Sequence, residues 1–403
     1  ADWLPEGAPA IDVPAELLAQ QGAPLPVPAG CEDFRAVVQA GGQPQPVAIG
    51  LDDVALMTYT SGTTGLPKGA MLSHFNLYSN ALQGEAWMHG AQYRKEVFYA
   101  ILPMFHAFGM TLFLTYGILK QGRLVLFPSF DVDLVLDAAR RHPPTVYCAV
   151  PPIYEATARR AKERGISLRT AKYCISGAMA LPDATVELWE SVSGGLLVEG
   201  YGMTEASPVC LGNPFADTRR TGTIGVPFPS TWMKVVDPDD PTVEVLQGER
   251  GELLIKGPGV TPGYWNLPEA TAAAIRDGWL HSGDIAYVDD EGDYYIVDRA
   301  KDMFISGGEN VYSKEVEDVL CTHPDVQDVA VIGRPHPEWG ETVVAVLTLK
   351  PGKTPDHEDL RQFMETRLAR YKIPRIFEVR DALPRTATGK LLKHMLRGSP
   401  SNH

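Results

Sequence analysis

The spacing of hydrophobic and polar positions predicts the fold class before any single residue is considered. Between about residues 97 and 260, short β-rich runs alternate with segments whose apolar residues recur at helical spacing. This alternation favours an α/β fold, in which a large domain of layered sheets and helices forms around a mostly parallel sheet. The predicted strands are 97–102, 123–127, 146–150 and 172–176, and the predicted helices lie near 132–141, 152–164 and 182–191.

From about residue 222 the pattern changes to short strands separated by turns, which predicts a β-rich subdomain. After Lys301, two amphipathic helices and a strand pair predict a small α+β domain. The helices are expected over 313–321, with Val316, Val319 and Leu320 on one face, and over 356–371, with Leu360, Phe363, Met364 and Leu368 inward. The strands are expected at 231–236, 252–257, 283–288, 293–297, 326–332 and 341–348.

Four parts are therefore expected along the chain. Residues 1–50 are rich in Pro, Gly and Ala and form a partly irregular lead-in, with a short helical pattern near 14–21. Residues 51–220 form the α/β part, residues 221–300 the β-rich subdomain, and residues 301–403 the small C-terminal domain.

A phosphate-cradling arrangement is predicted around residues 58–70. The apolar run 54–59 predicts a buried strand, and three hydroxyls and two glycines then fall within 61–65, ahead of Lys68. Glycines let the backbone approach a ligand, N–H groups and hydroxyls donate to phosphate oxygens, and the lysine supplies charge. A flexible polar surface loop is the alternative. A helix is expected next, capped by Ser73 and carrying Phe75, Tyr78 and Leu82 at helical spacing.

This segment is not a Walker A loop. That motif needs Gly directly before the Lys and Ser or Thr directly after it, whereas Pro67 and Gly69 flank Lys68.

Composition narrows the class of protein. A chain of 403 residues is expected to hold two or three domains, and 44% apolar with 21% charged residues is ordinary for a soluble globular protein. The net charge of −14 argues against nucleic acid or an anionic membrane as the main partner. The five scattered cysteines form no CxxC pair, which argues against structural zinc and a disulfide framework and fits a reducing cytosol. No apolar stretch is long enough to span a bilayer and no signal-peptide pattern is visible, so a cytoplasmic protein without a transmembrane segment is expected.

Two glycine-containing motifs each follow an apolar strand-like run, at 175–178 and 198–205. Glycine permits the flat approach of a ligand, and an aromatic residue such as Tyr201 can stack on a base. Glu205 is the kind of oxygen ligand that Mg²⁺ prefers when phosphates supply the rest. The alternative is a pair of tight turns with a solvated glutamate.

Four further segments have both a functional and a structural interpretation. Segment 102–109 surrounds His106 with aromatic residues, and a packed turn with a satisfied histidine is the alternative. Segment 278–284 ends in Asp284, whose carboxylate can accept two hydrogen bonds from a ribose diol. The charge cluster 298–302 and Lys390, on a glycine-threonine loop, are by default solvated surface features.

Taken together and in this order, the motifs resemble the adenylate-forming superfamily of acyl-CoA synthetases, peptide-synthetase adenylation domains and firefly-type luciferases. The resemblance covers about residues 50–395 and points most to fatty and aryl acyl-CoA ligases, through the segments around His106 and 307–310. Family members usually carry well over a hundred residues before the phosphate loop, whereas only 57 precede Thr58 here. A natural short form, a fragment and one piece of a cleaved protein all fit this length.

The resemblance implies a role for each motif residue. Lys390 is the catalytic lysine, Lys301 the hinge of a mobile C-terminal domain, and Glu205 the metal ligand, while His106 lies at the entrance for the carboxylate. Thr204 meets the phosphate, Asp284 binds the ribose, and Arg299 approaches the nucleotide. The remaining cofactor-binding residues are Thr60, Ser61, Gly62, Thr63, Thr64, Gly65, Lys68, Gly177, Ala178, Glu199, Gly200, Tyr201, Gly202, Met203, Ile296, Gly307 and Gly308.

The implied reaction joins a carboxylic acid to CoA with ATP and Mg²⁺. The carboxylate attacks the α-phosphorus of ATP to give acyl-AMP and pyrophosphate, and a thiol then takes the acyl group and releases AMP. No protein nucleophile is needed, because catalysis rests on positioning and charge stabilisation. Rotation about Lys301 would replace the Lys390 loop by residues 306–310 for the second step.

Three alternatives remain open: an enzyme that loads a carrier protein, a luciferase-like oxygenase, and an inactive nucleotide-binding fragment. The Met, Phe and Leu residues near His106 favour an apolar acid, fatty or aromatic. Oligomeric state is open as well, a homodimer included.

Overall fold

The computed structural model describes residues 26–43, 45–60, 67–354, 356–385 and 391–397. The chain divides into two compact units, Ala1–Ile49 and Gly50–His403. In the first unit the described residues contain one short helix, α2 (Phe34–Gln39), and the helical pattern expected near 14–21 lies outside the described residues. All elements below belong to the second unit.

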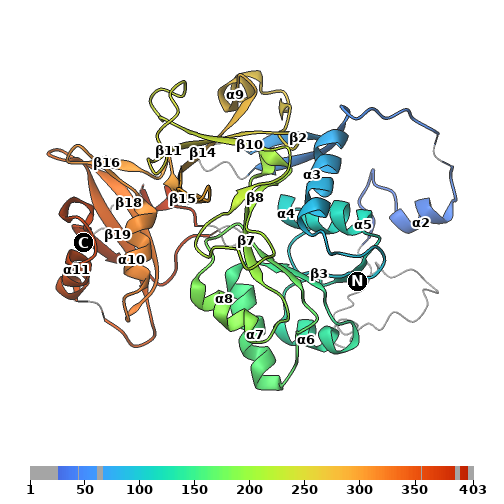
Figure 1. Cartoon of the computed structure of the whole chain (residues 1–403), viewed down its shortest axis with the longest axis horizontal. Helices are drawn as coiled ribbons and strands as arrows, with labels where there is room; N and C mark the ends of the chain where they lie inside the picture. The colour runs from blue at the N-terminus through green and yellow to red at the C-terminus, as the bar shows by residue number, and fades with distance from the viewer. Residues whose placement is uncertain (1–25, 44, 61–66, 355, 386–390, 398–403) are drawn as a thin grey trace. The chain divides into compact units, whose positions relative to one another are not determined.

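A seven-stranded sheet in the order β4-β3-β5-β6-β7-β8-β9 forms the centre of the α/β part (Figure 1). The first five strands run parallel, and β8 and β9 continue the sheet antiparallel. The predicted α/β class with a largely parallel sheet is therefore confirmed. The strands are β3 (Val97–Ala100), β4 (Arg123–Leu126), β5 (Val146–Ala149), β6 (Tyr173–Ser176), β7 (Leu197–Gly202), β8 (Val209–Gly212) and β9 (Val226–Pro227).

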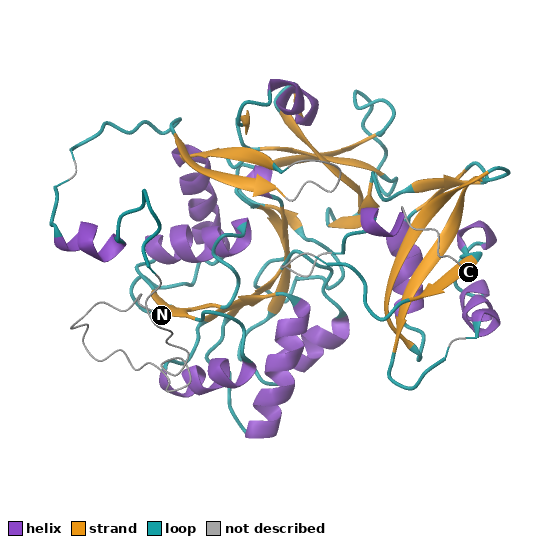
Figure 2. Ribbon diagram, turned by 180° about the vertical axis from the view of Figure 1, so that it is seen from behind, coloured by secondary structure: helices purple, strands orange, loops and turns teal. Residues whose placement is uncertain are grey.

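Helices cover both faces of this sheet because successive strand residues point to opposite sides. Tyr99 and Tyr147 enter one core, which packs against α6, α7 and α8, while Phe98 and Val146 enter a second core beneath α3 and η1. Figures 1 and 2 show the same two groups of helices on either side of the sheet. The helices are α4 (Ala107–Gly109), the π-helical η1 (Met110–Tyr116), α5 (Gly117–Leu119), α6 (Val132–Arg141), α7 (Pro151–Arg164) and α8 (Asp183–Glu190).

A three-stranded sheet in the order β1-β2-β12 carries the predicted phosphate segment. Strand β1 (Val54–Thr60) confirms the predicted strand, but the predicted burial is wrong, because its residues are exposed or half-buried. Lys68 begins a second antiparallel strand, β2 (Lys68–Ser73), rather than leading straight into the helix. Helix α3 (His74–Trp87) then starts at Ser73 as predicted. The Ser73 side chain accepts from the Asn76 N–H, and the Asn76 side chain accepts from the Ser73 N–H.

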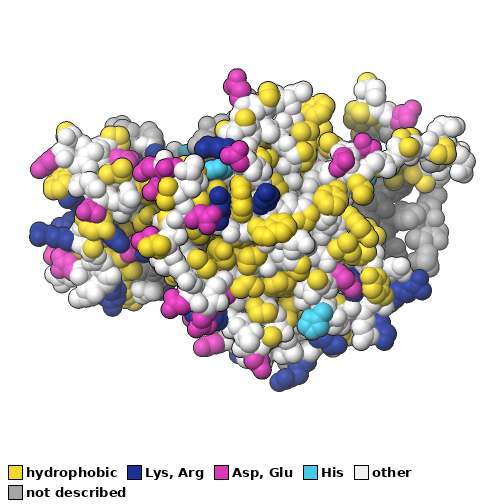
Figure 3. All heavy atoms as spheres, turned by 45° about the horizontal axis from the view of Figure 1, so that its top comes forward, with side chains coloured by type: hydrophobic (Ala, Val, Ile, Leu, Met, Phe, Trp, Pro, Cys, Tyr) yellow, Lys and Arg dark blue, Asp and Glu magenta, His cyan; other side chains and the backbone are white. Residues whose placement is uncertain are grey.

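The apolar stripe of α3 is not the face that packs. Phe75, Tyr78 and Leu82 are 42%, 54% and 43% exposed, and hydrophobic side chains gather over a broad area of the face in Figure 3. The buried face carries amides instead. The amide nitrogens of Asn76, Asn80 and Gln83 donate to the carbonyls of Pro258, Val209 and Pro229. Since a buried amide must be hydrogen-bonded, these distant carbonyls determine which face of α3 is inward.

The β-rich part is a sheet in the order β10-β11-β14-β13, with β15 paired to β14. All four strands predicted between 231 and 297 are present, with β14 longer than expected. Their bounds are β10 (Trp232–Val236), β11 (Gly251–Lys256), β13 (Ile275–Arg276), β14 (Trp279–Val288) and β15 (Tyr294–Arg299), with β12 (Gly263–Tyr264) and α9 (Pro268–Ala274) between them.

The C-terminal part has its own sheet, in the order β17-β16-β19-β18 with β20 parallel to β19, and its own core. The predicted helix over 313–321 and the predicted strand pair are confirmed. The second predicted helix is wrong at its end, because it stops at Glu365 and a 3₁₀ turn follows. Ala369, with φ −62° and ψ 143°, is extended and separates α11 from that turn. The elements are β16 (Phe304–Ser306), β17 (Glu309–Val311), α10 (Ser313–Cys321), β18 (Val326–His336), β19 (Gly340–Leu349), α11 (His357–Glu365), η3 (Arg370–Lys372), β20 (Ile376–Val379) and α12 (His394–Arg397).

The predicted domain limits at residues 220 and 300 stay predictions. Within the described part of the chain, no helix is both long and apolar enough to cross a bilayer.

Candidate active site

The β1–β2 hairpin brings the two ends of the predicted phosphate loop together. Thr60 pairs with Lys68, and the Thr60 hydroxyl donates to the Lys68 carbonyl at 3.4 Å. Ser61, Gly62, Thr63, Thr64 and Gly65 lie outside the described residues. The Lys68 Nζ lies 5.0 Å from the ring centroid of Tyr264, so the lysine is directed across an aromatic face.

Glu205 is a buried carboxylate, 8% exposed, on the short 3₁₀ segment η2 (Thr204–Ala206). Its Oε1 accepts a 2.7 Å hydrogen bond from the hydroxyl of Tyr264, and its backbone carbonyl accepts from the Thr261 N–H. Among the described residues no group of three or more His, Cys, Asp or Glu side chains could hold a metal ion. A single carboxylate fits Mg²⁺, which prefers one or two protein carboxylates together with substrate phosphates and water.

The turns after β6 and β7 lie side by side. Ser176 pairs with Glu199, and a Cβ built on Gly177 would lie 3.2 Å from both the Gly200 carbonyl oxygen and the ring of Phe108. Ala178 is exposed and takes a positive φ of 66°. The predicted adenine-pocket residues of the two motifs are therefore adjacent, with the aromatic segment 102–109 beside them.

Gly202 stands where no side chain fits. A Cβ there would lie 2.1 Å from the Pro208 carbonyl oxygen, because β7 and β8 approach closely at a register shift between Tyr201 and Gly202. The glycine therefore determines the path of the chain from Tyr201 to Glu205.

Tyr201, Asp284 and Arg299 meet although they are far apart in the sequence. The Tyr201 hydroxyl donates to Asp284 Oδ2 at 2.5 Å, and Arg299 Nε lies 3.3 Å from Asp284 Oδ1. Burial and the Asp284 charge raise the pKa of Tyr201 well above its ordinary value. Asp284 and Arg299 are paired across β14 and β15, and Ile296 and Met203 pack in the core under the same sheet. The predicted ribose ligand therefore lies against the predicted base-stacking residue.

Asp284 is preceded by a turn that Glu252 holds. Glu252 Oε1 accepts from the Gly283 N–H at 3.1 Å, and Glu252 Oε2 lies 2.9 Å from His281 Nδ1. Both contacts come from the neighbouring strand β11, so Asp284 is supported from two strands.

Glu199 is nearly fully buried on β7, with the Leu181 N–H donating to its Oε2 at 3.3 Å. Burial raises the pKa of Glu199 to about 7, against smaller lowering effects of the Leu181 hydrogen bond and the Lys314 charge. A carboxyl group whose pKa lies near 7 gains or loses its charge when small changes in its surroundings shift that pKa.

His106 begins helix α4, where its Nδ1 accepts from the Phe108 N–H at 3.3 Å. This hydrogen bond caps the helix and satisfies the histidine, as the alternative of a packed turn expects. The same segment borders the turn at Gly177 through Phe108, so the predicted position beside the nucleotide site is compatible with the geometry.

The predicted hinge and thiol-side residues lie in the C-terminal part. Lys301 lies between β15 and β16, and its carbonyl accepts from Arg397 at 3.0 Å. Gly307 and Gly308 form the exposed turn of the β16–β17 hairpin, with φ values of 63° and 87°, and no atom of a described residue lies within 4 Å of a Cβ built on Gly308. Lys390 lies outside the described residues, between the paired residues Arg385 and Leu391.

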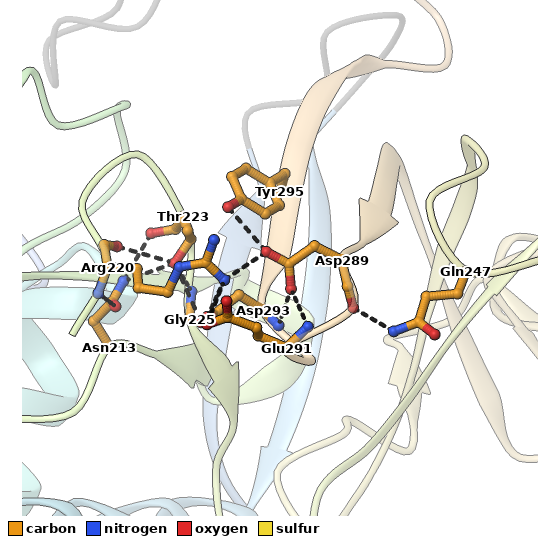
Figure 4. Close-up of polar contacts among 9 residues, drawn as sticks. All are labelled: Asn213, Arg220, Thr223, Gly225, Gln247, Asp289, Glu291, Asp293 and Tyr295. Atoms are coloured by element: carbon orange, nitrogen blue, oxygen red, sulfur yellow. Dashed lines mark hydrogen bonds and ion pairs between the residues drawn. The ribbon is translucent and has the colours of Figure 1, made fainter. Parts of the chain in front are cut away.

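An arginine network connects the central sheet to the β14–β15 hairpin (Figure 4). Arg220 Nη1 lies 2.6 Å from Asp289, 3.0 Å from Asp293 and 3.4 Å from Glu291. Tyr295 also donates to Asp289. The hairpin that carries Asp284 and Arg299 is thus tied to the loop before β9 by one cation.

The sequence patterns did not point to Tyr264 or Glu252, whereas Phe108 belongs to the predicted aromatic segment 102–109. Tyr264 lies in the tripeptide Gly263–Trp265, and the aromatic pair after a glycine is the one feature of the sequence that could have drawn attention to it. Its contact with Glu205 spans 59 positions, so no local periodicity could reveal it.

Comparisons with known proteins identify the family of this chain. A model of the AMP-binding enzyme family matches residues 8–265, and a model of the AMP-binding enzyme C-terminal domain matches residues 315–390. The chain belongs to the AMP-binding enzyme family. A long-chain-fatty-acid–CoA ligase of Bacillus subtilis is 42% identical over 352 residues, 87% of this chain and 63% of the relative. A feruloyl-CoA synthase of Amycolatopsis is 40% identical, over 93% of this chain and 74% of the relative.

Solved structures with bound nucleotide are similar as well. ATP-bound MatB from Rhodopseudomonas palustris has a TM-score of 0.79 at 36% identity, over 86% of this chain and 68% of that one. The Bacillus subtilis o-succinylbenzoate CoA synthetase, in complex with ATP and magnesium, has a TM-score of 0.78 at 33% identity, over 86% and 70%. These matches confirm the resemblance seen in the motifs. The chain spans about two thirds of the length of the relatives it matches.

Proposed function

We propose that this chain catalyses the ATP-dependent joining of an apolar carboxylic acid, fatty or aromatic, to CoA through an acyl-AMP intermediate. The single observation that carries the proposal is the placement of segment 201–205. At one end Tyr201 contacts Asp284 and, through it, Arg299, and at the other end Glu205 contacts Tyr264, whose ring faces Lys68. Segment 201–205 therefore links Asp284, the proposed ribose ligand, to Lys68 and Glu205, the proposed phosphate and metal ligands.

Each site residue has a defined part in the proposed first half-reaction. Asp284 is oriented by Tyr201 and Arg299 and would accept hydrogen bonds from the ribose hydroxyls. Lys68 would donate to phosphate oxygens, and Glu205 is the carboxylate that would hold Mg²⁺. Bound Mg²⁺ would offset charge on the pyrophosphate that leaves. Lys390, by its match to the family motif, would bridge the carboxylate and the α-phosphate.

The second half-reaction needs a thiol to reach the acyl-AMP carbonyl carbon. The turn at Gly307 and Gly308 is exposed, and no described residue crowds Gly308, which suits a thin pantetheine arm. Rotation at Lys301 would bring this turn to the site and remove Lys390 from it. The names of the relatives, a fatty-acid ligase and a feruloyl-CoA synthase, support both acid classes. The cysteines Cys148, Cys174 and Cys210 are buried free thiols, which supports a cytoplasmic setting.

The test is incubation with ATP, Mg²⁺, CoA and a panel of fatty and aromatic acids, with products read by mass spectrometry. Acyl-CoA and AMP are expected, with acyl-AMP accumulating when CoA is left out. Acyl-AMP that never becomes acyl-CoA would instead indicate a carrier protein as acceptor. Bound ATP with neither product would refute the ligase.

A further inference from the structure

Tyr264 contacts the two groups at the phosphate end of the site and has no assigned role. Its hydroxyl donates to Glu205 Oε1 at 2.7 Å, and its ring lies under the Lys68 ammonium at 5.0 Å. We propose that Tyr264 is a positioning residue, which orients the Glu205 carboxylate toward a divalent cation and keeps the Lys68 ammonium apart from that carboxylate. This inference rests on the proposed function and deepens it.

The backbone around Tyr264 is held in place from three sides. Strand β12 pairs with β2, the strand that begins at Lys68, through Tyr264 and Ala70. The Trp265 N–H donates to the Gly69 carbonyl at 2.8 Å, and the Tyr264 N–H donates to the Thr271 hydroxyl at 2.9 Å. The ring therefore cannot move independently of the strand that carries Lys68.

Glu205 is tied to the same short segment. The Thr261 N–H donates to the Glu205 carbonyl at 2.8 Å, and the buried Thr261 hydroxyl donates to the Met71 carbonyl of β2. Residues 261–264 thus connect the backbone of Glu205 to β2, and Tyr264 adds the side-chain contact. Gly263 makes this turn possible, since its φ is 145° and a Cβ would lie 2.4 Å from Thr271.

The hydroxyl contact leaves one carboxylate oxygen for a metal. Tyr264 occupies Oε1, and Oε2 has no hydrogen bond within the part of the chain that the structure describes. A hydrogen bond to one oxygen of a carboxylate fixes the orientation of that carboxylate, which is the pattern of outer-shell support for metal ligands.

The contact between the Tyr264 ring and Lys68 keeps the Lys68 ammonium available to the substrate. A lysine close to a buried carboxylate would pair with it, and each would then be lost to the substrate. An aromatic face attracts the ammonium without neutralising it. Tyr264 therefore keeps the Lys68 ammonium available for phosphate oxygens and the Glu205 carboxylate available for the divalent ion within one site.

Two substitutions separate the contacts. Tyr264→Phe keeps the ring and removes the hydroxyl, and Tyr264→Leu removes both. Tyr295→Phe is the matched control, because Tyr295 also donates to a carboxylate, Asp289, at 3.1 Å but lies in the arginine network away from the phosphate end. Calorimetry would measure Mg²⁺ binding to the ATP complex, and separately ATP binding in the presence of a chelator. Melting temperatures would show that each variant is folded.

Tyr264→Phe is expected to weaken Mg²⁺ binding roughly 10–100-fold, the usual cost of losing an outer-shell partner. Its affinity for ATP without metal should stay at the wild-type value, whereas Tyr264→Leu should weaken both. In a Glu205→Gln background, Tyr264→Phe should cause no further loss of Mg²⁺ binding.

Wild-type Mg²⁺ binding by a folded Tyr264→Phe would overturn the inference alone, and so would an equal additional loss in the Glu205→Gln background. Absence of Mg²⁺-dependent ATP binding in the wild type would overturn the proposed function together with the inference.

Discussion

Replacing Glu199 by glutamine should make the protein more stable at alkaline pH and leave it unchanged at acid pH. The folded protein holds this carboxyl in a buried strand, where burial raises its pKa from 4.5 to about 7. Between these two values the folded state binds more protons at this site than the unfolded state. The free energy of unfolding therefore falls as pH rises from about 4.5 to about 7.

The magnitude follows from the two pKa values. The difference between 4.5 and about 7 corresponds to about 3 kcal/mol, present as a penalty above pH 7 and absent below pH 4.5. Glutamine has the shape of the protonated side chain, and its oxygen can accept from the Leu181 N–H. It therefore removes the penalty without removing that hydrogen bond.

The assay is the melting temperature of wild type and Glu199→Gln, without ligand, at pH 5, 6, 7 and 8. With the average unfolding entropy per residue and 403 residues, about 3 kcal/mol corresponds to a rise of about 4 °C at pH 8. At pH 5 the two melting temperatures should nearly coincide. Glu187→Gln, an exposed position on the adjacent helix α8, is the control and should shift little at either pH.

A parallel pH dependence in wild type and Glu199→Gln would refute this reasoning, and so would a lower melting temperature of the variant at pH 8. Either result would mean that Glu199 is ionised and stabilised when the protein is folded.

The other predictions concern the supports of the site and its domain movement. Arg220→Ala should lower the melting temperature by several degrees, because it leaves the buried Asp293 without its cation. Arg159→Ala removes only an exposed ion pair and should not lower it. Equal melting temperatures of the two variants would show that the network in Figure 4 does not hold the hairpin. Gly202→Ala should lower the free energy of unfolding by roughly 1–3 kcal/mol and weaken ATP binding, since its Cβ would meet the Pro208 carbonyl. In the control Gly42→Ala, the new Cβ meets no described atom within 4 Å. Calorimetry that finds the two variants alike would contradict this prediction. Lys390→Ala should abolish adenylation yet still convert supplied acyl-AMP to thioester, and normal adenylation would remove Lys390 from its role. Lys301→Pro should retain adenylation and lose thioester formation, and equal loss of both half-reactions would count against the hinge.

Much of the fold could be predicted from the sequence because it depends on local patterns. The helix over 313–321 and the strands of the central sheet follow from periodicity, and the start of α3 follows from a capping serine. The motif residues Tyr201 and Asp284 could be predicted as neighbours only through the family resemblance, since their contact spans 83 positions.

The contacts that local patterns could not predict depend on distant partners. The inward face of α3 is chosen by carbonyls more than a hundred positions away, so its apolar stripe was a misleading signal. Helix α11 ends at Glu365, ahead of an extended residue at Ala369, although apolar residues at helical spacing continue to Leu368. Tyr264 could not be placed against Glu205 because a two-residue strand carries almost no periodic signal.

The central claim is that a carboxylate oxygen attacks the α-phosphorus of ATP at this site. It is tested most directly with an acid labelled with ¹⁸O in its carboxylate, incubated with ATP, Mg²⁺ and CoA, and mass analysis of the nucleotide. One labelled oxygen in AMP, in step with acyl-CoA formed, is the predicted result. Label in inorganic phosphate with ADP as the nucleotide product, or unlabelled AMP, would contradict it.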